Sequence, residues 1–263
     1  MYSYYECDDL GPANWYKINS ICNGARQSPI DLPASAVLRT KPLCIKNFEV
    51  KPDSNNIKND GHGAQIVFNY RHNDKCLLSG GSLKYKYEVA KAHWHWGQFN
   101  YAGSEHSLNG HQYSAELHIV AFASKYGSLS NAVDKSDGLA VLAFFYELDN
   151  RNEERSDFII KKDLGLIVKS NTNDYIRIQN SFSLKDLIKY QRFHYFSYQG
   201  SLTTPPCYES VTWIVANTPL KIKTEDLDEL RNLKDNEGRC ILKNCRPIQH
   251  SHQSRQITDY RQY

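Results

Sequence analysis

The chain has 263 residues, with 32 lysines and arginines against 29 aspartates and glutamates, which gives a formal net charge of +3. Because the two signs are mixed along the chain and no basic block occurs, the composition argues against binding to nucleic acid or to a membrane surface. The sequence also contains no apolar run of the roughly 18–20 residues that span a bilayer, so it predicts no membrane span.

Short runs rich in Val, Ile, Tyr, Phe and Trp follow one another along the chain and predict β-strands. They occupy residues 65–70, 87–97, 114–123, 139–148, 175–179, 194–202 and 210–216. Helix signals are fewer. Residues 156–168 form an ambiguous pattern, whereas residues 224–234 carry Thr224 as a candidate cap and leucines at helical spacing. The sequence therefore predicts one mainly β domain over residues 1–263, with a few short helices.

Cysteine usage and the start of the chain bear on the cellular compartment. The seven cysteines form no CxxC pair, so a zinc ribbon is not expected. Their number favours an oxidising compartment with at least one thiol left unpaired. The opening residues, MYSYYECDD, show no signal-peptide pattern, and we expect them to be a mature or trimmed N-terminus behind an added methionine.

Two histidines stand two positions apart in the run AHWHWG. On a strand, residues i and i+2 project from the same face, so His93 and His95 point together and the tryptophans point away. His118 lies in another predicted strand, AELHIVAF, and antiparallel pairing would bring it beside them. Three converging imidazoles suit a catalytic Zn²⁺ with an open fourth position. Spacing alone leaves hydrogen-bonded core histidines as the alternative, and it indicates a zinc hydrolase or hydratase without choosing the substrate.

Several further motifs occur in order along the chain. They are RQSPIDL (26–32), DGHG (60–63), AHWHWG (92–97), GSEHSLNGHQYSAELHIV (103–120), GSLTTPPCYESVTWIV (200–215), NCRPIQ (244–249) and RQI (255–257). Together they resemble the α-class carbonic anhydrases over nearly the whole chain. The resemblance implies that family's fold, built on a large, twisted, mostly antiparallel central sheet. It also implies reversible hydration of carbon dioxide to bicarbonate and a proton by a zinc-bound hydroxide.

The resemblance assigns the centre of the site. His93, His95 and His118 would bind the Zn²⁺ cofactor, which in carbonic anhydrase itself is known to lower the pKa of bound water to about 7. Thr203 would accept a hydrogen bond from the hydroxide and donate its own to Glu105. That chain would fix the direction of the hydroxide lone pair, which is a positioning role.

The same resemblance assigns residues around the centre. His62 would shuttle protons to the buffer, because an imidazole titrates near pH 6.5. Glu116 and the backbone carbonyl of Asn244 would accept the remaining ring N–H groups of His118 and His95. The implied substrate pocket, which would otherwise be read mostly as ordinary core, consists of Val120, Val141, Leu202, Thr204, Val211 and Trp213. Two cavity tyrosines and one structural histidine are also implied, at Tyr4, Tyr198 and His106.

The sequence departs from the family pattern beside the first ligand. Lys91 stands two residues before His93, where many members carry glutamine, and a lysine side chain has no acceptor for a histidine N–H. The partner of His93 is therefore open, between a water and another carbonyl. Asp60 and Gln65 stand where asparagines are common around the shuttle, and we expect them to alter the water chain without abolishing it.

Cys22 and Cys207 match a disulfide of secreted and membrane-anchored members, which cytosolic members generally lack. The bond would tie the N-terminal segment to the loop that carries Thr203, and its loop-closure entropy corresponds to roughly 4–5 kcal/mol. The resemblance thus implies an extracellular protein, secreted or anchored to the outer face of the plasma membrane, with a lipid anchor beyond the C-terminus. The sequence leaves open how the others pair: Cys7, Cys44, Cys76, Cys240 and Cys245.

Two other functions compete with carbon dioxide hydration. Some carbonic-anhydrase-like domains have lost ligand histidines and bind a protein or a glycan, but the implied ligands, Thr203 and Glu105 are all present here. A zinc esterase would use the same hydroxide, and the small pocket argues against that as the main role. The predicted small-molecule partners are carbon dioxide and bicarbonate, and the sequence carries no signal for an oligomeric state.

Overall fold

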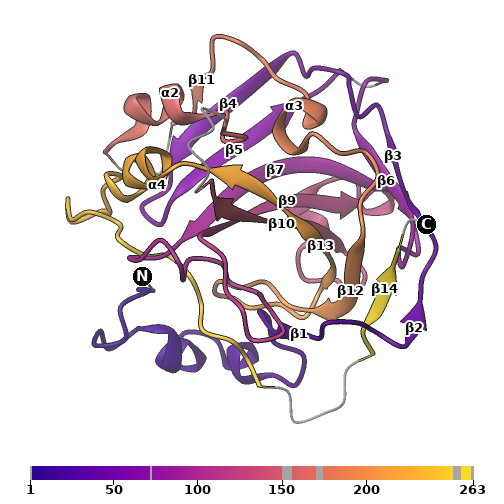
Figure 1. Cartoon of the computed structure of the whole chain (residues 1–263), viewed down its shortest axis with the longest axis horizontal. Helices are drawn as coiled ribbons and strands as arrows, with labels where there is room; N and C mark the ends of the chain where they lie inside the picture. Colours follow the sequence, from indigo (N-terminus) through magenta and orange to yellow (C-terminus); the bar gives the residue numbers. More distant parts are fainter. Residues whose placement is uncertain (1, 72, 150–155, 170–173, 251–255, 262–263) are drawn as a thin grey trace.

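The computed structural model describes residues 2–71, 73–149, 156–169, 174–250 and 256–261. A twisted 12-stranded sheet runs through the molecule (Figure 1). Its longer strands are β4 (Ser54–Asn59), β5 (Ala64–Asn69), β7 (Tyr87–Trp96), β9 (Ala115–Ala123), β10 (Leu139–Leu148), β12 (Tyr195–Gly200) and β13 (Val211–Ile222). Its shorter strands are β2 (Leu38–Arg39), β3 (Leu43–Lys46), β6 (Leu77–Gly80), β11 (Ile176–Arg177) and β14 (Thr258–Tyr260).

The order of strands across the sheet is β11-β4-β5-β7-β9-β10-β13-β12-β14-β2, with β6 also paired to β7 and β3 paired to β6. Most neighbours are antiparallel, which confirms the predicted sheet, but β10–β13 and β14–β2 are parallel pairs. A separate two-stranded sheet pairs β1 (Asp31–Leu32) with β8 (Ser107–Leu108). The sheet is therefore mixed, with the parallel pair β10–β13 near its middle.

Each of the predicted strand runs contains a strand, and β10 spans the predicted residues 139–148. β13 continues to Ile222, beyond the predicted end at residue 216. β4 was not predicted, because its sequence SNNIKN is mostly polar and shows only one apolar residue. Its polar side chains alternate between half-buried and buried positions, so its place between β5 and β11 outweighs its low strand propensity.

Helices are short and lie around the sheet (Figure 1). The α-helices are α1 (Leu129–Ala132), α2 (Lys161–Leu164), α3 (Leu184–Ile188) and α4 (Thr224–Arg231), and the 3₁₀ helices are η1 (Pro12–Lys17), η2 (Ser20–Asn23), η3 (Ser124–Tyr126) and η4 (Gly165–Ile167). The predicted cap at Thr224 is wrong, since Thr224 is the first helical residue; the Asp226 carboxylate instead accepts the backbone N–H of Lys223. Within the described residues, no helix has the length and apolarity needed to cross a membrane.

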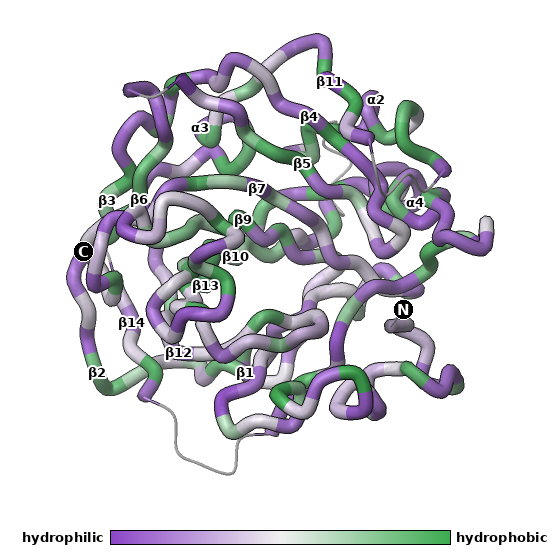
Figure 2. Tube along the Cα trace, turned by 180° about the vertical axis from the view of Figure 1, so that it is seen from behind, coloured by the Kyte–Doolittle hydropathy of each residue, from purple (hydrophilic) through white to green (hydrophobic). Residues whose placement is uncertain are grey.

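The two faces of the central strands carry different side chains. Trp94 and Trp96 point into the larger hydrophobic core, as the alternation in β7 predicts. β9 is buried along its whole length, and apolar stretches follow β9, β10 and β13 through the interior (Figure 2). The opposite face carries a smaller core around Val141 and Trp213, and the histidines project on that side. Close packing behind the histidines therefore fixes the backbone from which they project.

A disulfide joins Cys22, in η2, to Cys207, in the loop after β12, across a sequence separation of 185. This is the pairing that the family resemblance implied. The other five cysteines, all of which the structure describes, are unpaired: Cys7, Cys44, Cys76, Cys240 and Cys245.

Removing this disulfide is expected to destabilise the fold. In the Cys22→Ala/Cys207→Ala variant we expect the free energy of unfolding, measured with urea, to fall by about 2–5 kcal/mol, because the denatured chain regains the freedom of a very long loop. Cys44→Ala, which removes an exposed free thiol, is the control and should stay within about 0.5 kcal/mol of the parent. An unchanged midpoint and slope in the double variant would contradict this account.

Candidate active site

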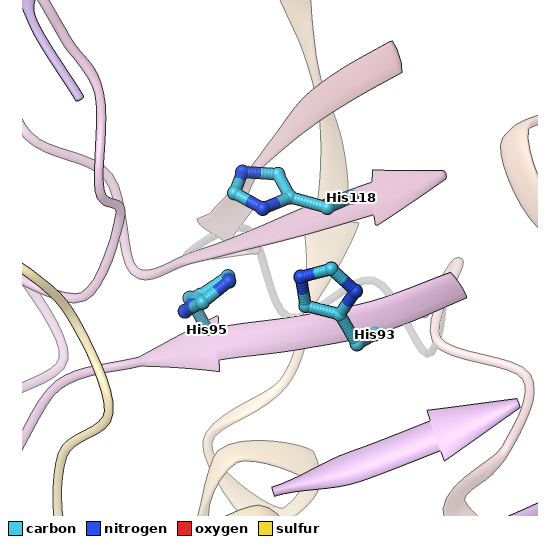
Figure 3. A group of neighbouring side chains, drawn as sticks. All are labelled: His93, His95 and His118. Atoms are coloured by element: carbon cyan, nitrogen blue, oxygen red, sulfur yellow. The ribbon is translucent and has the colours of Figure 1, made fainter. Parts of the chain in front are cut away.

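Three histidines gather where β7 and β9 lie side by side. The antiparallel register places His93 opposite His118, as the sequence predicted, and also places His95 opposite Glu116. The ring centroids of the three histidines lie 4.5–5.2 Å apart. One nitrogen from each ring lies within 4.8 Å of the other two, and Figure 3 shows the rings converging from the two strands. Such a cluster of imidazole nitrogens is the donor set that Zn²⁺ takes in catalytic sites.

Hydrogen bonds select which nitrogen two of these rings present. His95 Nδ1 lies 2.8 Å from the carbonyl oxygen of Asn244, and His118 Nε2 lies 2.7 Å from Glu116 Oε1. The other nitrogen of each ring, Nε2 of His95 and Nδ1 of His118, is left for the centre of the cluster. Nε2 of His95 is buried and has no hydrogen-bond partner among the described residues. A metal ion would satisfy that orphaned acceptor, so the residues present fit zinc.

Burial keeps the rings of His93 and His118 neutral. It lowers the pKa of His118 to about 4, helped by the neighbouring His95 and opposed by Glu116. It also holds the pKa of His93 well below its ordinary value, again helped by the neighbouring histidines. Neutral imidazole is the form that binds a metal. The site is therefore ready for a cation at neutral pH.

Glu116 is the hub of a buried hydrogen-bond network behind the cluster. His106 approaches its two carboxylate oxygens, with Nδ1 2.6 Å from Oε1 and the backbone N–H 2.8 Å from Oε2. His106 Nε2 in turn lies 2.7 Å from the hydroxyl of Tyr198. Burial alone would raise the pKa of Glu116, but His106 and His118 outweigh it and hold the pKa below its ordinary value. We expected Tyr198 to be a cavity residue. In the structure it is buried and belongs to the hydrogen-bond network behind the cluster.

Glu105 is completely buried beside the cluster. Its Oε1 accepts the backbone N–H of Arg246 at 2.8 Å, while Oε2 has no hydrogen bond of good geometry among the described residues. Burial raises the pKa of Glu105, whereas His95, the Arg246 N–H and the Thr203 hydroxyl favour the carboxylate. The structure therefore places the Thr203 hydroxyl beside Glu105 and leaves Glu105 Oε2 available as an acceptor.

Arg246 was missed as an individual residue, although it stands in the NCRPIQ motif. Its guanidinium donates to Gln27 Oε1, to the carbonyl of Ser28 and to the carbonyl of Cys22, all at 2.8–2.9 Å. Burial lowers its pKa to about 10. Because the same residue donates its backbone N–H to Glu105, it links the disulfide-bearing N-terminal segment to the centre of the site.

His62 lies on the turn between β4 and β5. Gly61 has φ +86° and no room for a side chain against Asn236, so the tight turn requires glycine there. The His62 ring stacks on Tyr2 at 4.0 Å, a contact that no sequence pattern signalled. Asn244 Nδ2 donates to the carbonyl of His62, which joins this turn to the ligand strand. Burial lowers the pKa of His62, and the Asp60 carboxylate opposes that effect.

A cavity of about 90 Å³ extends between His62 and the metal-ligand candidates. Tyr2, Tyr4, Lys91 and Thr204 line it together with His93 and His95. The expected apolar residues lie in the adjoining core: Val120, Val141, Val211 and Trp213 share one buried cluster, and Leu202 packs on it. The Trp213 ring is 4.8 Å from that of His118, so this apolar surface borders the histidines.

Comparison with known proteins agrees with this geometry. The sequence matches the family described as eukaryotic-type carbonic anhydrase over residues 10–261. The chain belongs to the eukaryotic-type carbonic anhydrase family. It is 36% identical to carbonic anhydrase 7 of Mus musculus over 247 residues, which cover 92% of this chain and 91% of that protein. It is also 35% identical to carbonic anhydrase 7 of Homo sapiens over 247 residues, which again cover 92% of this chain and 91% of that protein. Family membership supports carbon dioxide hydration as the general reaction.

One of the three candidate ligands lacks the hydrogen-bond acceptor that the other two have. Lys91 Nζ donates to Gln65 Oε1 at 2.8 Å and offers nothing to His93. His93 Nδ1 is buried and has no hydrogen-bond partner among the described residues. The sequence left a water or another carbonyl as the hydrogen-bond partner of His93. Within the described part of the chain, no carbonyl accepts a hydrogen bond from His93 Nδ1.

Proposed function

We propose that the protein is a zinc-dependent carbonic anhydrase that interconverts carbon dioxide and bicarbonate. The observation that carries this is the convergence of three imidazole nitrogens within 4.8 Å, directly beside the buried Glu105. When bound there, zinc would supply a water that loses its proton near neutral pH. His93, His95 and His118 would hold it, and Glu116 and the carbonyl of Asn244 would orient two of the rings.

Thr203 and Glu105 would orient the nucleophile. Because the Arg246 N–H occupies Glu105 Oε1, Oε2 is free to accept a hydrogen bond from the Thr203 hydroxyl, and the Thr203 oxygen would then present a lone pair to the nucleophile. A nucleophile whose O–H donates a hydrogen bond to the Thr203 oxygen has its own lone pair directed elsewhere, toward carbon dioxide. The apolar surface around Trp213 would hold carbon dioxide, which offers few hydrogen-bonding groups, while Thr204 would contact the bicarbonate formed.

His62 would carry the released proton to the buffer. It lines the same cavity as His93 and His95, so a water chain there can reach it. Its lowered pKa keeps the ring neutral and able to accept a proton at pH 7. Stacking on Tyr2 would hold the ring at the cavity.

Replacing His62 with alanine is expected to lower the maximal turnover by about tenfold or more in weak buffer, since positioned acid–base groups typically contribute 10²–10⁴-fold. Stopped-flow carbon dioxide hydration in dilute and in concentrated imidazole buffer measures the effect. Concentrated imidazole should restore most of the turnover. An unchanged turnover of the alanine variant in dilute buffer would exclude His62 as the main proton relay.

We also propose that residues 1–263 form one catalytic domain and that it works outside the cell, secreted or anchored to the outer face of the plasma membrane. The Cys22–Cys207 bond supports the location, because disulfides persist in oxidising compartments. Mass spectrometry of peptides from the protein in its native source, kept non-reduced, should find these two residues linked. Both thiols free there would contradict an oxidising location.

The decisive test of the activity is stopped-flow hydration of carbon dioxide by the protein with its metal content measured. We expect fast hydration that is lost on zinc chelation, restored by added zinc and inhibited by a sulfonamide. A protein that holds one zinc per chain and does not accelerate hydration would support the competing reading, a carbonic-anhydrase-like domain that binds a protein or glycan.

A further inference from the structure

Each candidate ligand has an outer nitrogen, the ring nitrogen that points away from the centre of the cluster. The three histidines differ in whether this nitrogen has a hydrogen-bond acceptor. His95 Nδ1 and His118 Nε2 each lie within 2.8 Å of an oxygen acceptor. His93 Nδ1 has none among the described residues, although the atom is buried. Figure 3 shows the other nitrogen of His93 directed toward the two rings and Nδ1 directed away from them. The less buried side of the cluster is therefore formed by His93, whose ring has no hydrogen bond to a described residue at Nδ1.

The register of the sheet explains where an acceptor for His93 would come from. Gln65, on β5, is the cross-strand partner of His93, and Lys91 lies two residues before His93 on the same face of β7. These are the two polar side chains that the pleat places beside the outer edge of the ring. Lysine offers no acceptor. Gln65 has one amide oxygen on its side chain, and that oxygen accepts from Lys91 Nζ at 2.8 Å.

The rest of the Gln65 amide is also committed. Its Nε2 donates to the hydroxyl of Tyr175 at 2.5 Å, and the ammonium of Lys58 lies 4.6 Å from the centre of the Tyr175 ring. A turn of the amide toward His93 would break the contact with Lys91 and disturb the contact with Tyr175. Lys91 thus supplies no acceptor to His93 and holds the neighbouring acceptor away from it.

We propose that Lys91 is a positioning residue that weakens zinc binding by leaving His93 Nδ1 without a protein acceptor among the described residues. The inference rests on the proposed zinc site. An accepted hydrogen bond at the outer nitrogen fixes the ring and raises its basicity toward the metal, and loss of such a partner typically costs 10–100-fold in metal affinity. The ammonium of Lys91 adds electrostatic repulsion toward a dication on the same side. His93 is then the ligand from which zinc first dissociates.

The test is to give His93 an acceptor and measure zinc affinity directly. In Lys91→Gln we expect the zinc dissociation constant, measured by competition with a chelator, to fall about tenfold, and zinc release to slow correspondingly. An NMR spectrum of the zinc-loaded protein with ¹⁵N-labelled histidine supplies a readout that general stability does not move. Lys91→Gln should add one slowly exchanging imidazole N–H signal, from His93 Nδ1.

A matched variant separates the acceptor from the charge. Lys91→Met with Gln65→Leu removes the ammonium and leaves no amide oxygen beside His93. We expect its zinc affinity to stay closer to that of the parent than to that of Lys91→Gln, and its His93 N–H signal to stay absent. Thermal unfolding of all three apoproteins checks that they are equally folded.

Two results would overturn the inference. One is an equal zinc affinity for the parent and Lys91→Gln, and the other is an equal gain in both variants, which would assign the effect to charge alone. Failure of the proposed function is distinguishable, because a parent protein that binds no zinc, or binds it and does not hydrate carbon dioxide, fails before any variant is compared.

Discussion

His95→Ala is expected to lose zinc on dialysis and to lower carbon dioxide hydration by at least about 10³-fold, which corresponds to about 4 kcal/mol of activation free energy. The ring lies at the buried end of the cluster and is held by the carbonyl of Asn244. Its removal leaves two ligand nitrogens, and the buried carbonyl of Asn244 loses its partner. Two imidazoles bind zinc far more weakly than a converged set of three.

The measurement has two parts, zinc per chain after dialysis and hydration by stopped flow. His111→Ala is the matched control, because His111 is exposed, lies outside the cluster and should keep both the metal and the rate. Retention of one zinc per chain by His95→Ala, with more than a tenth of the parent rate, would show that His95 is not a ligand. Both readouts are needed, since a metal-loaded but inactive variant would place His95 in another role.

Alternation in two strands was enough to predict the central geometry. The i, i+2 spacing in β7 puts Trp94 and Trp96 in the core and the histidines on the other face, and antiparallel pairing then brings His118 opposite His93. Both steps follow from the pleat of a strand, which is why they were available from local sequence. The position of β4 could not be predicted from local sequence. This strand is mostly polar, and it forms because it pairs with the neighbouring strands.

The supporting contacts were predicted unevenly. Local spacing can suggest that Glu116 and His118 share a face, but the acceptor of His95 is a carbonyl from residue 244, 149 positions away in sequence. Arg246 likewise joins Glu105 to the N-terminal segment through contacts that no local pattern encodes. Lys91 was recognised as an unsuitable partner for His93, but its hydrogen bond to Gln65 depends on side-chain rotamers and could not be predicted.

The contacts of Tyr2, near the N-terminus, also could not be predicted from a local sequence pattern. The N-terminal segment has no regular structure at this residue, so no periodicity marks it. In the folded protein its ring stacks on His62 and lines the cavity beside Thr204. The disulfide and the guanidinium of Arg246 hold the following part of this segment against the body of the protein. The N-terminal segment thus completes a cavity whose other walls come from β5 and β7, from the turn of His62 and from the loops of Thr204 and Asn244.

Thr203→Val is expected to lower kcat/KM for carbon dioxide hydration by about 10²-fold while zinc content stays unchanged. Valine has nearly the shape of threonine and suits this buried position, so the main loss is the hydroxyl. Without it, Glu105 Oε2 loses its hydrogen-bond donor and the nucleophile loses the group that fixes its orientation. A misdirected nucleophile at an otherwise intact site typically costs about this factor, near 3 kcal/mol.

Thr203→Ser is the matched control, since it restores the hydroxyl and removes only a methyl group. We expect it to stay within about tenfold of the parent and clearly above the valine variant. Glu105→Gln should resemble Thr203→Val, because a neutral amide that donates its N–H to Thr203 reverses the direction of the hydrogen bond. If valine and serine were equally active, the hydroxyl would not orient the nucleophile, and the buried carboxylate of Glu105 would have to act through the His95 ring, which lies 3.4 Å from it.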